Sequence, residues 1–167
     1  MADNAQPNII FILLDDLGKE WISCYGATDV ETPNIDALAQ GGMRFENVYS
    51  MPQCTPTRVA LMTGRYPSRF GPKAQQASNG PAFPLGTPTL ASMFTAQGYE
   101  TYLCGKWHLG SSKSHGPNHH GFQHSYGSLA GAIGMYDHHY RKGKFANTWH
   151  RDGELIPGAE NGVHATD

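Results

Sequence analysis

The hydrophobic and polar positions along the chain predict several short strands. Residues 8–14 predict a buried strand, because they contain a continuous apolar run, residues 9–14, that is rich in β-branched side chains. Residues 43–48 alternate between apolar and polar positions, and residues 99–104 follow a turn glycine, so two further strands are predicted there. The turn pair Asp152-Gly153 lies between two short apolar segments and predicts a hairpin.

Three short helices are predicted where a threonine and a proline precede an apolar stretch and glycine follows it. The start signals are Thr32-Pro33, Thr55-Pro56 and Thr87-Pro88, and the stop signals are Gly41-Gly42, Gly64 and Gly98. Residues 65–86 are rich in proline, glycine and serine and predict a loop. Because strands and helices alternate, we expect an α/β sheet with functional groups at the strand ends.

Length and composition favour a globular protein. The 167 residues are 39% hydrophobic and 16% charged. The longest apolar run, residues 9–14, is far shorter than the roughly 20 residues of a membrane span, so no membrane span is expected. The net charge of −2 argues against nucleic-acid binding by bulk electrostatics. No export signal is visible, because the first residues lack a basic start and an apolar stretch.

Charge is distributed unevenly along the chain. Residues 1–57 carry eight acids and two bases, whereas residues 58–151 carry ten bases and two acids. This distribution is consistent with a cation site and an anion site side by side. The alternative is an uneven solvated surface.

Two adjacent acids, Asp15 and Asp16, follow the apolar run of residues 9–14. Acids at the end of a buried strand are costly unless a cation or hydrogen-bond donors meet them, and such oxygen pairs suit Ca²⁺ or Mg²⁺. The alternative is a loop cap or a surface turn. The three cysteines predict neither a disulfide framework nor a zinc motif, because their number is odd and no C-x-x-C spacing occurs.

Two pairs of residues form further candidate sites. Cys54 lies just before a predicted helix N-terminus, which favours negative charge, and Arg58 follows one helical turn later. Lys106 and His108 lie two residues apart after a predicted strand. If the strand continues, their side chains point to the same side and make an anion site with a proton-transfer group. The alternatives are a small buried cysteine and ordinary polarity at a strand end.

Together these segments resemble the sulfatase family. The family core C-x-P-x-R is present from Cys54 to Arg58, and the longer signature G-Y-x-T-x-x-x-G-K-x-H is matched at every fixed position from Gly98 to His108. Asp15-Asp16 is the third matching element. The resemblance covers about residues 7–127 and continues more weakly to the end. It implies an alkaline-phosphatase-like α/β fold with a mixed, mostly parallel sheet flanked by helices, present only in part.

The resemblance implies hydrolysis of an organic sulfate ester, either a sulfated carbohydrate or an aryl sulfate. In the family a separate formylglycine-generating or anaerobic maturation enzyme converts the motif cysteine, here Cys54, to Cα-formylglycine. The hydrated aldehyde attacks sulfur, the alcohol leaves, and sulfate is then eliminated. Asp15, Asp16 and the modified Cys54 resemble ligands of a Ca²⁺ ion, with Mg²⁺ as the alternative, and Arg58 resembles the residue that balances this charge.

Lys106 and His108 resemble the family's sulfate-contacting lysine and its proton-accepting histidine. All nine histidines lie between His108 and His164, without the H-E-x-x-H motif of a zinc site, so most are expected to be loop residues. His138 and His139 are weaker candidates for substrate binding, and Trp107 is a candidate to face the leaving group.

Because family members are several hundred residues long, residues 1–167 are expected to be the N-terminal part of a catalytic domain, without its C-terminal half and subdomain. The protein is expected in the periplasm or secreted if an export signal has been removed. Two other functions stay open: a phosphonate monoester or phosphodiester hydrolase of the same superfamily, and a catalytically incomplete fragment.

Overall fold

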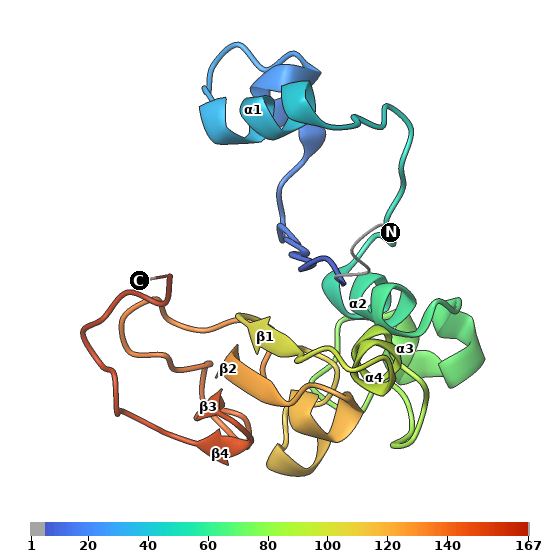
Figure 1. Cartoon of the computed structure of the whole chain (residues 1–167). Coiled ribbons are helices and arrows are strands. Elements are labelled where there is room, and N and C mark those ends of the chain that lie inside the picture. The colour runs from blue at the N-terminus through green and yellow to red at the C-terminus, as the bar shows by residue number, and fades with distance from the viewer. Residues whose placement is uncertain (1–5, 167) are drawn as a thin grey trace. The chain divides into compact units, whose positions relative to one another are not determined.

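The computed structural model describes residues 6–166, and the chain divides into two compact units, Met1–Tyr49 and Ser50–Asp167 (Figure 1). The first unit contains η1 (Lys19–Trp21), η2 (Ser23–Tyr25) and α1 (Pro33–Gly41). The helices of the second unit are α2 (Cys54–Thr63), η3 (Pro67–Phe70), α3 (Pro72–Gln75), α4 (Leu90–Ala96), η4 (Lys113–His115) and η5 (Pro117–His120). Its strands are β1 (Tyr102–Cys104), β2 (His124–Ser128), β3 (Trp149–Arg151) and β4 (Glu154–Leu155).

Asp36 holds the first unit together. Helix α1 begins at Pro33, as its cap signals predict, and places the Asp36 carboxylate beside η2. This carboxylate accepts hydrogen bonds from the Ser23 hydroxyl at 2.6 Å, the Cys24 backbone N–H at 2.9 Å and the Thr32 hydroxyl at 3.2 Å. The Ser23 bond is the main reason that the pKa of Asp36 is lowered.

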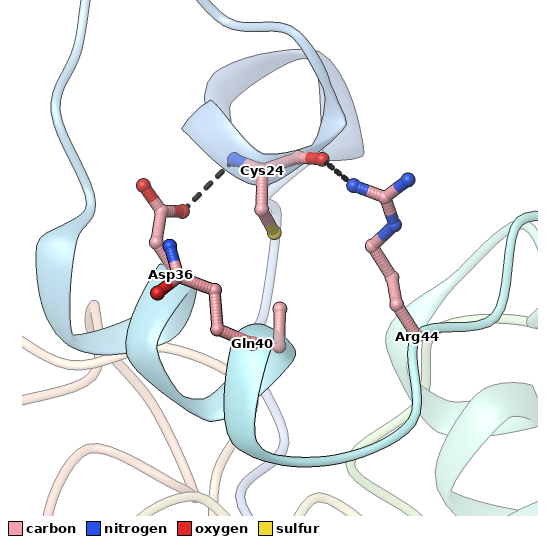
Figure 2. Close-up of a pocket in the computed structure, with 5 residues that line it drawn as sticks. Cys24, Asp36, Gln40 and Arg44 are labelled. Carbon is pink, nitrogen blue, oxygen red and sulfur yellow. Dashed lines mark hydrogen bonds between the residues drawn. The ribbon is translucent and has the colours of Figure 1, made fainter.

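A pocket of about 270 Å³ lies between η2 and α1, lined by Cys24, Asp36, Ala39, Gln40 and Arg44 (Figure 2). Its charged side chains already have partners within the unit. The Cys24 N–H donates to Asp36, and the Cys24 carbonyl accepts from the Arg44 guanidinium. Arg44 also pairs with Glu46 at 2.6 Å. The polar groups of this pocket therefore join η2 to α1 and to the segment that follows α1.

Two predicted strands of the first unit are wrong. Residues 8–14 and 43–48 have no strand structure, and their apolar side chains are exposed; Ile10 is 86% exposed and Met43 is 77% exposed. An apolar run forms a buried strand only when another strand satisfies its backbone and another layer covers its side chains. Within residues 6–166 neither segment pairs with a strand.

The second unit contains a four-stranded sheet in the order β1-β2-β3-β4. Strands β1 and β2 are parallel, with Leu103 opposite Ser125, whereas β2 with β3 and β3 with β4 are antiparallel. The expected mixed sheet with flanking helices is confirmed, and one of its three pairings is parallel. Asp152-Gly153 joins β3 to β4 as the predicted hairpin.

The core of the second unit lies between the helices and the residues that follow β1 and β2. Its members include Val59 and Met62 of α2, Phe83, Trp107 and Leu129, all at most 7% exposed. Burying a side chain of this size contributes roughly 1.5–3 kcal/mol relative to leaving it in water. Helix α2 and the segment that contains Trp107 are therefore held by one apolar cluster.

The predicted helices of the second unit are present, with shifted starts. Helix α2 begins at Cys54, two residues before the predicted first helical residue Pro56, and is capped by Gly64 in a left-handed conformation. Helix α4 begins only at Leu90, because Thr89 and Ser92 form a reciprocal capping box with hydrogen bonds of 3.0 and 2.8 Å. Helices η3 and α3 lie in the segment predicted to be a loop. No helix within residues 6–166 is long and apolar enough to cross a membrane.

We predict that acid loosens the first unit through Asp36. Because folding lowers the pKa of Asp36, its stabilising contribution is present above the ordinary aspartate value of 3.8 and is lost as the pH falls through the folded value. Hydrogen exchange at the Cys24 amide should accelerate in this range relative to amides of the second unit. Asp36→Asn should accelerate it already at neutral pH, and Asp29→Asn, at an exposed acid of the same unit, should not. Equal exchange in both variants would contradict this role.

Candidate active site

Helix α2 presents Cys54 at its first turn. The preceding residue, Gln53, is extended, and its side chain accepts a hydrogen bond from the Ala77 N–H at 2.7 Å, which ties the helix start to the following loop. Thr55 and Val59 face the core, while Cys54 is half-buried. The cysteine side chain thus lies where unpaired N–H groups and the helix dipole favour negative charge.

The segment after β1 leaves the strand conformation but stays attached to β2 and the residues that follow it. Gly105 and Trp107 donate backbone hydrogen bonds of 2.8 and 2.9 Å to Tyr126 and Ser128, and His108 donates one of 3.2 Å to Leu129. Lys106 and His108 were expected to share one side of a continuing strand, but the strand ends at Cys104. Residues 105–108, called here the turn after β1, instead position the Lys106 and His108 side chains.

His108 is the centre of this arrangement. Its side chain is 5% exposed, and its backbone has a φ of 55°, a left-handed conformation that a non-glycine residue adopts only when its surroundings impose it. Its Nδ1 lies 3.2 Å from Cys54 Sγ and 3.4 Å from Thr55 Oγ1. Two residues 54 positions apart in the sequence, each singled out for its motif, are thus in contact.

The fully buried Thr55 joins three segments. Its hydroxyl faces both Nδ1 and the carbonyl oxygen of His108, the latter at 3.3 Å. It also accepts a hydrogen bond of 3.2 Å from the Ser78 N–H. Helix α2, the loop around residue 78 and the turn at His108 therefore meet at this side chain.

Arg58 connects α2 to the other candidate residue of the turn. Its guanidinium Nη1 donates a hydrogen bond to the carbonyl oxygen of Lys106, and the side chains of both residues are half-buried. Arg58 thus contacts the backbone of Lys106. Two positive charges and the Cys54–His108 pair belong to one group of residues on α2 and the turn after β1, an arrangement that suits an anionic substrate.

Trp107 anchors this turn. Its side chain is 1% exposed, and its indole N–H donates to the His115 carbonyl at 2.8 Å. The ring lies against His120 and Phe122, so it faces the core and not a leaving group. A rigid aromatic anchor between Lys106 and His108 limits how far either can move.

Four candidates remain, two in each unit. Asp15 and Asp16 belong to the first unit, where both are exposed in a bend and Asp16 has a φ of 58°. His138 is 3% exposed and stacks on Trp149 at 4.2 Å, and His139 is exposed in the same loop. Within residues 6–166, no three histidine, cysteine or acidic side chains gather closely enough to hold a metal ion by themselves.

A comparison with known families identifies the family of the chain. The family model described as Sulfatase matches residues 7–165. The chain belongs to the sulfatase family. The resemblance on which the sequence interpretation rested is therefore confirmed.

Curated sulfatases share close to half of their aligned residues with this chain. Human steryl-sulfatase is 44% identical over 138 residues, which cover 74% of this chain and 24% of the relative. Arylsulfatase A of Bos taurus is 45% identical over 127 residues, which cover 73% of this chain and 25% of the relative. The chain thus spans about a quarter of the length of these relatives.

Solved structures share the fold. The crystal structure of Ps i-CgsB is 33% identical and superposes with a TM-score of 0.84 over 98% of this chain and 39% of that one. Its complex with k-i-k-neocarrahexaose is 30% identical and gives a TM-score of 0.76 over 92% of this chain and 37% of that one. These likenesses confirm the alkaline-phosphatase-like fold class predicted for this part of a sulfatase.

Sequence reasoning missed two buried histidines. His150 is fully buried in β3, where Nδ1 lies 2.7 Å from the Gly127 carbonyl and Nε2 lies 3.1 Å from the Ser125 hydroxyl. His120 is 3% exposed between Phe83 and Trp107, and neither of its ring nitrogens has a hydrogen-bond partner within the described chain. Most of the histidines were expected in loops, and the sequence interpretation assigned neither of these two a buried position.

We predict that His120 stays neutral at physiological pH. Burial lowers the pKa of His120 from 6.5 to about 4. The unfolded chain therefore binds more protons between these values, so the free energy of unfolding should decrease as the pH falls from 6.5 to about 4. His120→Phe should reduce this slope in denaturant titrations. The matched control is His119→Phe, at the exposed neighbouring position, which should retain it. An unchanged slope in His120→Phe would show that another group is responsible.

Proposed function

We propose that the full-length protein hydrolyses an organic sulfate ester, of a sulfated carbohydrate or an aryl alcohol, with Cys54 as the precursor of a formylglycine nucleophile. The observation that carries the proposal is the 3.2 Å contact between Cys54 Sγ and His108 Nδ1 at the start of α2. In a member of the sulfatase family, this contact joins the two longest sequence motifs at one point.

Cys54 is proposed as the position from which an anionic ester is attacked. An oxygen of formylglycine would stand near the present position of Sγ, within hydrogen-bonding reach of His108. The N-terminus of α2 favours negative charge on that oxygen and on an approaching sulfate group. His108 is the residue proposed to take a proton from this position when the sulfate group leaves.

Lys106 and Arg58 supply fixed positive charge. Lys106 is proposed to contact the sulfate group, and Arg58 to balance charge beside Cys54. The hydrogen bond from the Arg58 guanidinium to the Lys106 carbonyl keeps these residues together. Fixed cations of this kind stabilise charge that develops on the reacting oxygens.

Asp15 and Asp16 are proposed to hold a divalent cation, Ca²⁺ or in its place Mg²⁺, together with the modified Cys54. Their adjacent, exposed carboxylates offer the oxygen ligands that such hard cations prefer. When bound, the cation supplies positive charge that polarises the sulfate oxygens. The two carboxylates position that charge, while His108 and Lys106 act on the proton and the sulfate group.

The names of the relatives support the two substrate classes to different extents. Steryl-sulfatase and arylsulfatase A share the higher sequence identity with this chain. Ps i-CgsB, which was also solved with k-i-k-neocarrahexaose, shares the fold over nearly the whole length of this chain. His138 and His139 stay candidates for substrate binding. A formylglycine-generating or anaerobic maturation enzyme is the proposed partner, and a periplasmic or secreted location stays a prediction.

We predict formylglycine-dependent turnover of aryl sulfates by the full-length protein. Co-expression with a formylglycine-generating enzyme should lower the mass of the Cys54 peptide by about 18 Da. Cys54→Ala should abolish activity, whereas Cys104→Ala, at an exposed free cysteine, should leave it intact. Lys106→Ala should lower kcat by about 10²–10³-fold and His108→Ala by about 10²–10⁴-fold.

Three outcomes would contradict the proposal. A free thiol at Cys54 in fully active enzyme would exclude the formylglycine nucleophile. Faster turnover of an aryl phosphodiester or phosphonate monoester than of the aryl sulfate would assign the protein to the alternative hydrolase class. Absence of turnover by correctly modified full-length protein would favour the catalytically incomplete alternative.

We predict that activity requires a divalent cation held by the acids of the first unit. Chelation by EDTA should abolish sulfate ester turnover, and Ca²⁺ or Mg²⁺ should restore it. Asp15→Asn or Asp16→Asn should weaken calcium binding, measured by calorimetry on the full-length protein, by about 10²-fold or more, since even groups that only support a metal ligand contribute 10–100-fold. Asp29→Asn is the matched exposed control. Wild-type calcium affinity in both ligand variants would contradict this site.

A further inference from the structure

The imidazole of His108 lies close to the backbone of Gly131. A Cβ atom added at Gly131 would overlap ring atoms Cε1 and Nε2, each at 2.4 Å. The φ of Gly131 is not positive, so backbone conformation does not require glycine at this position. The space taken by the His108 ring is what excludes a side chain.

Asn79 holds Gly131 in this position. Its side-chain oxygen Oδ1 accepts a hydrogen bond of 3.2 Å from the Gly131 N–H and one of 2.8 Å from the Ser111 hydroxyl. The Asn79 backbone carbonyl accepts a further bond of 2.9 Å from the Ser111 N–H. Ser111 is only three residues after His108, and its hydroxyl also reaches the Leu129 carbonyl at 2.9 Å.

The Nδ1 side of the ring is held by the same loop. Ser78, the neighbour of Asn79, donates its backbone N–H to Thr55 Oγ1, which lies 3.4 Å from His108 Nδ1. Residues 78 and 79 therefore support both the threonine beside Nδ1 of the imidazole and the glycine beside Cε1 and Nε2. The residues that hold the ring lie outside the two sequence motifs, except for Thr55, which occupies a variable position of the first motif.

We propose that Gly131 and Asn79 are positioning residues for His108: they fix the ring so that Nδ1 faces residue 54. The close approach of the Gly131 backbone prevents the ring from moving away from α2, and the Asn79 amide oxygen fixes that backbone. This inference rests on the proposed function for its kinetic consequence, because a displacement of about 1 Å at a reacting group can lower a rate about 10²-fold. Its structural content is independent of any activity.

The kinetic test uses the full-length, matured protein. Gly131→Ala should lower kcat for an aryl sulfate by about 10–100-fold with little change in KM, because a proton-transfer group is displaced while substrate contacts remain. The matched control is Gly116→Ala, where the added Cβ would meet its nearest neighbour, Leu129 Cδ2, at an ordinary 3.4 Å. An unchanged kcat in folded Gly131→Ala protein would overturn the proposal.

Asn79 offers a conservative rescue. Asn79→Asp retains an oxygen acceptor for the Gly131 N–H and the Ser111 hydroxyl, whereas Asn79→Leu removes it. We expect kcat close to that of the wild type for the aspartate variant and a loss similar to that of Gly131→Ala for the leucine variant. Equal losses in both variants would show that the acceptor oxygen is not what matters.

A thermal double-mutant cycle separates this inference from the proposed function. Gly131→Ala should lower the melting temperature of the full-length protein, and this loss should disappear in a His108→Ala background, where the added methyl group has space. If wild-type protein turns over no sulfate ester, the proposed function fails and this cycle still decides the inference. If Gly131→Ala does not fold, His108→Ala/Gly131→Ala should. A loss of the same size in both backgrounds, or failure of the double variant to fold, would overturn it.

Discussion

The backbone of residues 105–108 continues to hydrogen-bond to β2 and the residues after it, although strand β1 has already ended. Successive bonds to Tyr126, Ser128 and Leu129 carry the turn along its neighbour, and the buried Trp107 ring fastens it to the core. The candidate active site depends on this constraint, because it brings a histidine to the start of α2 from 54 residues away. Arg58 and Thr55 bond to the turn from the helix side.

Local signals in the sequence predicted the parts of the fold that depend on local chemistry. Proline after a threonine predicted the start of α1, and Gly64 predicted the end of α2, since both act within one helical turn. Asp152-Gly153 predicted its hairpin for the same reason. Helix α4 began later than expected because the reciprocal bonds of Thr89 and Ser92 form a better cap than Thr87-Pro88.

Non-local features could not be predicted in this way. Whether residues 8–14 form a strand depends on a partner strand, and the left-handed backbone of His108 depends on β2, Thr55 and Gly131 together. The motifs named Cys54 and His108 but did not show their contact. His120 is buried by the aromatic rings of Phe83 and Trp107, and His150 is buried beside the Gly127 carbonyl. These neighbours are distant in the sequence, so no local pattern of apolar residues marks either histidine as buried. Asn79 and Gly131 carry no signal in a single sequence, because Asn79 acts through the hydrogen bonds of one side-chain oxygen and Gly131 through one excluded methyl group.

The exposed run from Ile9 to Leu14 has a consequence for the behaviour of the chain in concentrated solution. Six consecutive apolar residues without charge or proline, open to solvent along an extended backbone, have the composition that favours pairing between copies of the same segment. Asp15 and Asp16 end the run with two negative charges that repel their counterparts in a neighbouring molecule. Neutralising these acids, by low pH or by substitution, would therefore remove a barrier against self-association as well as two candidate metal ligands.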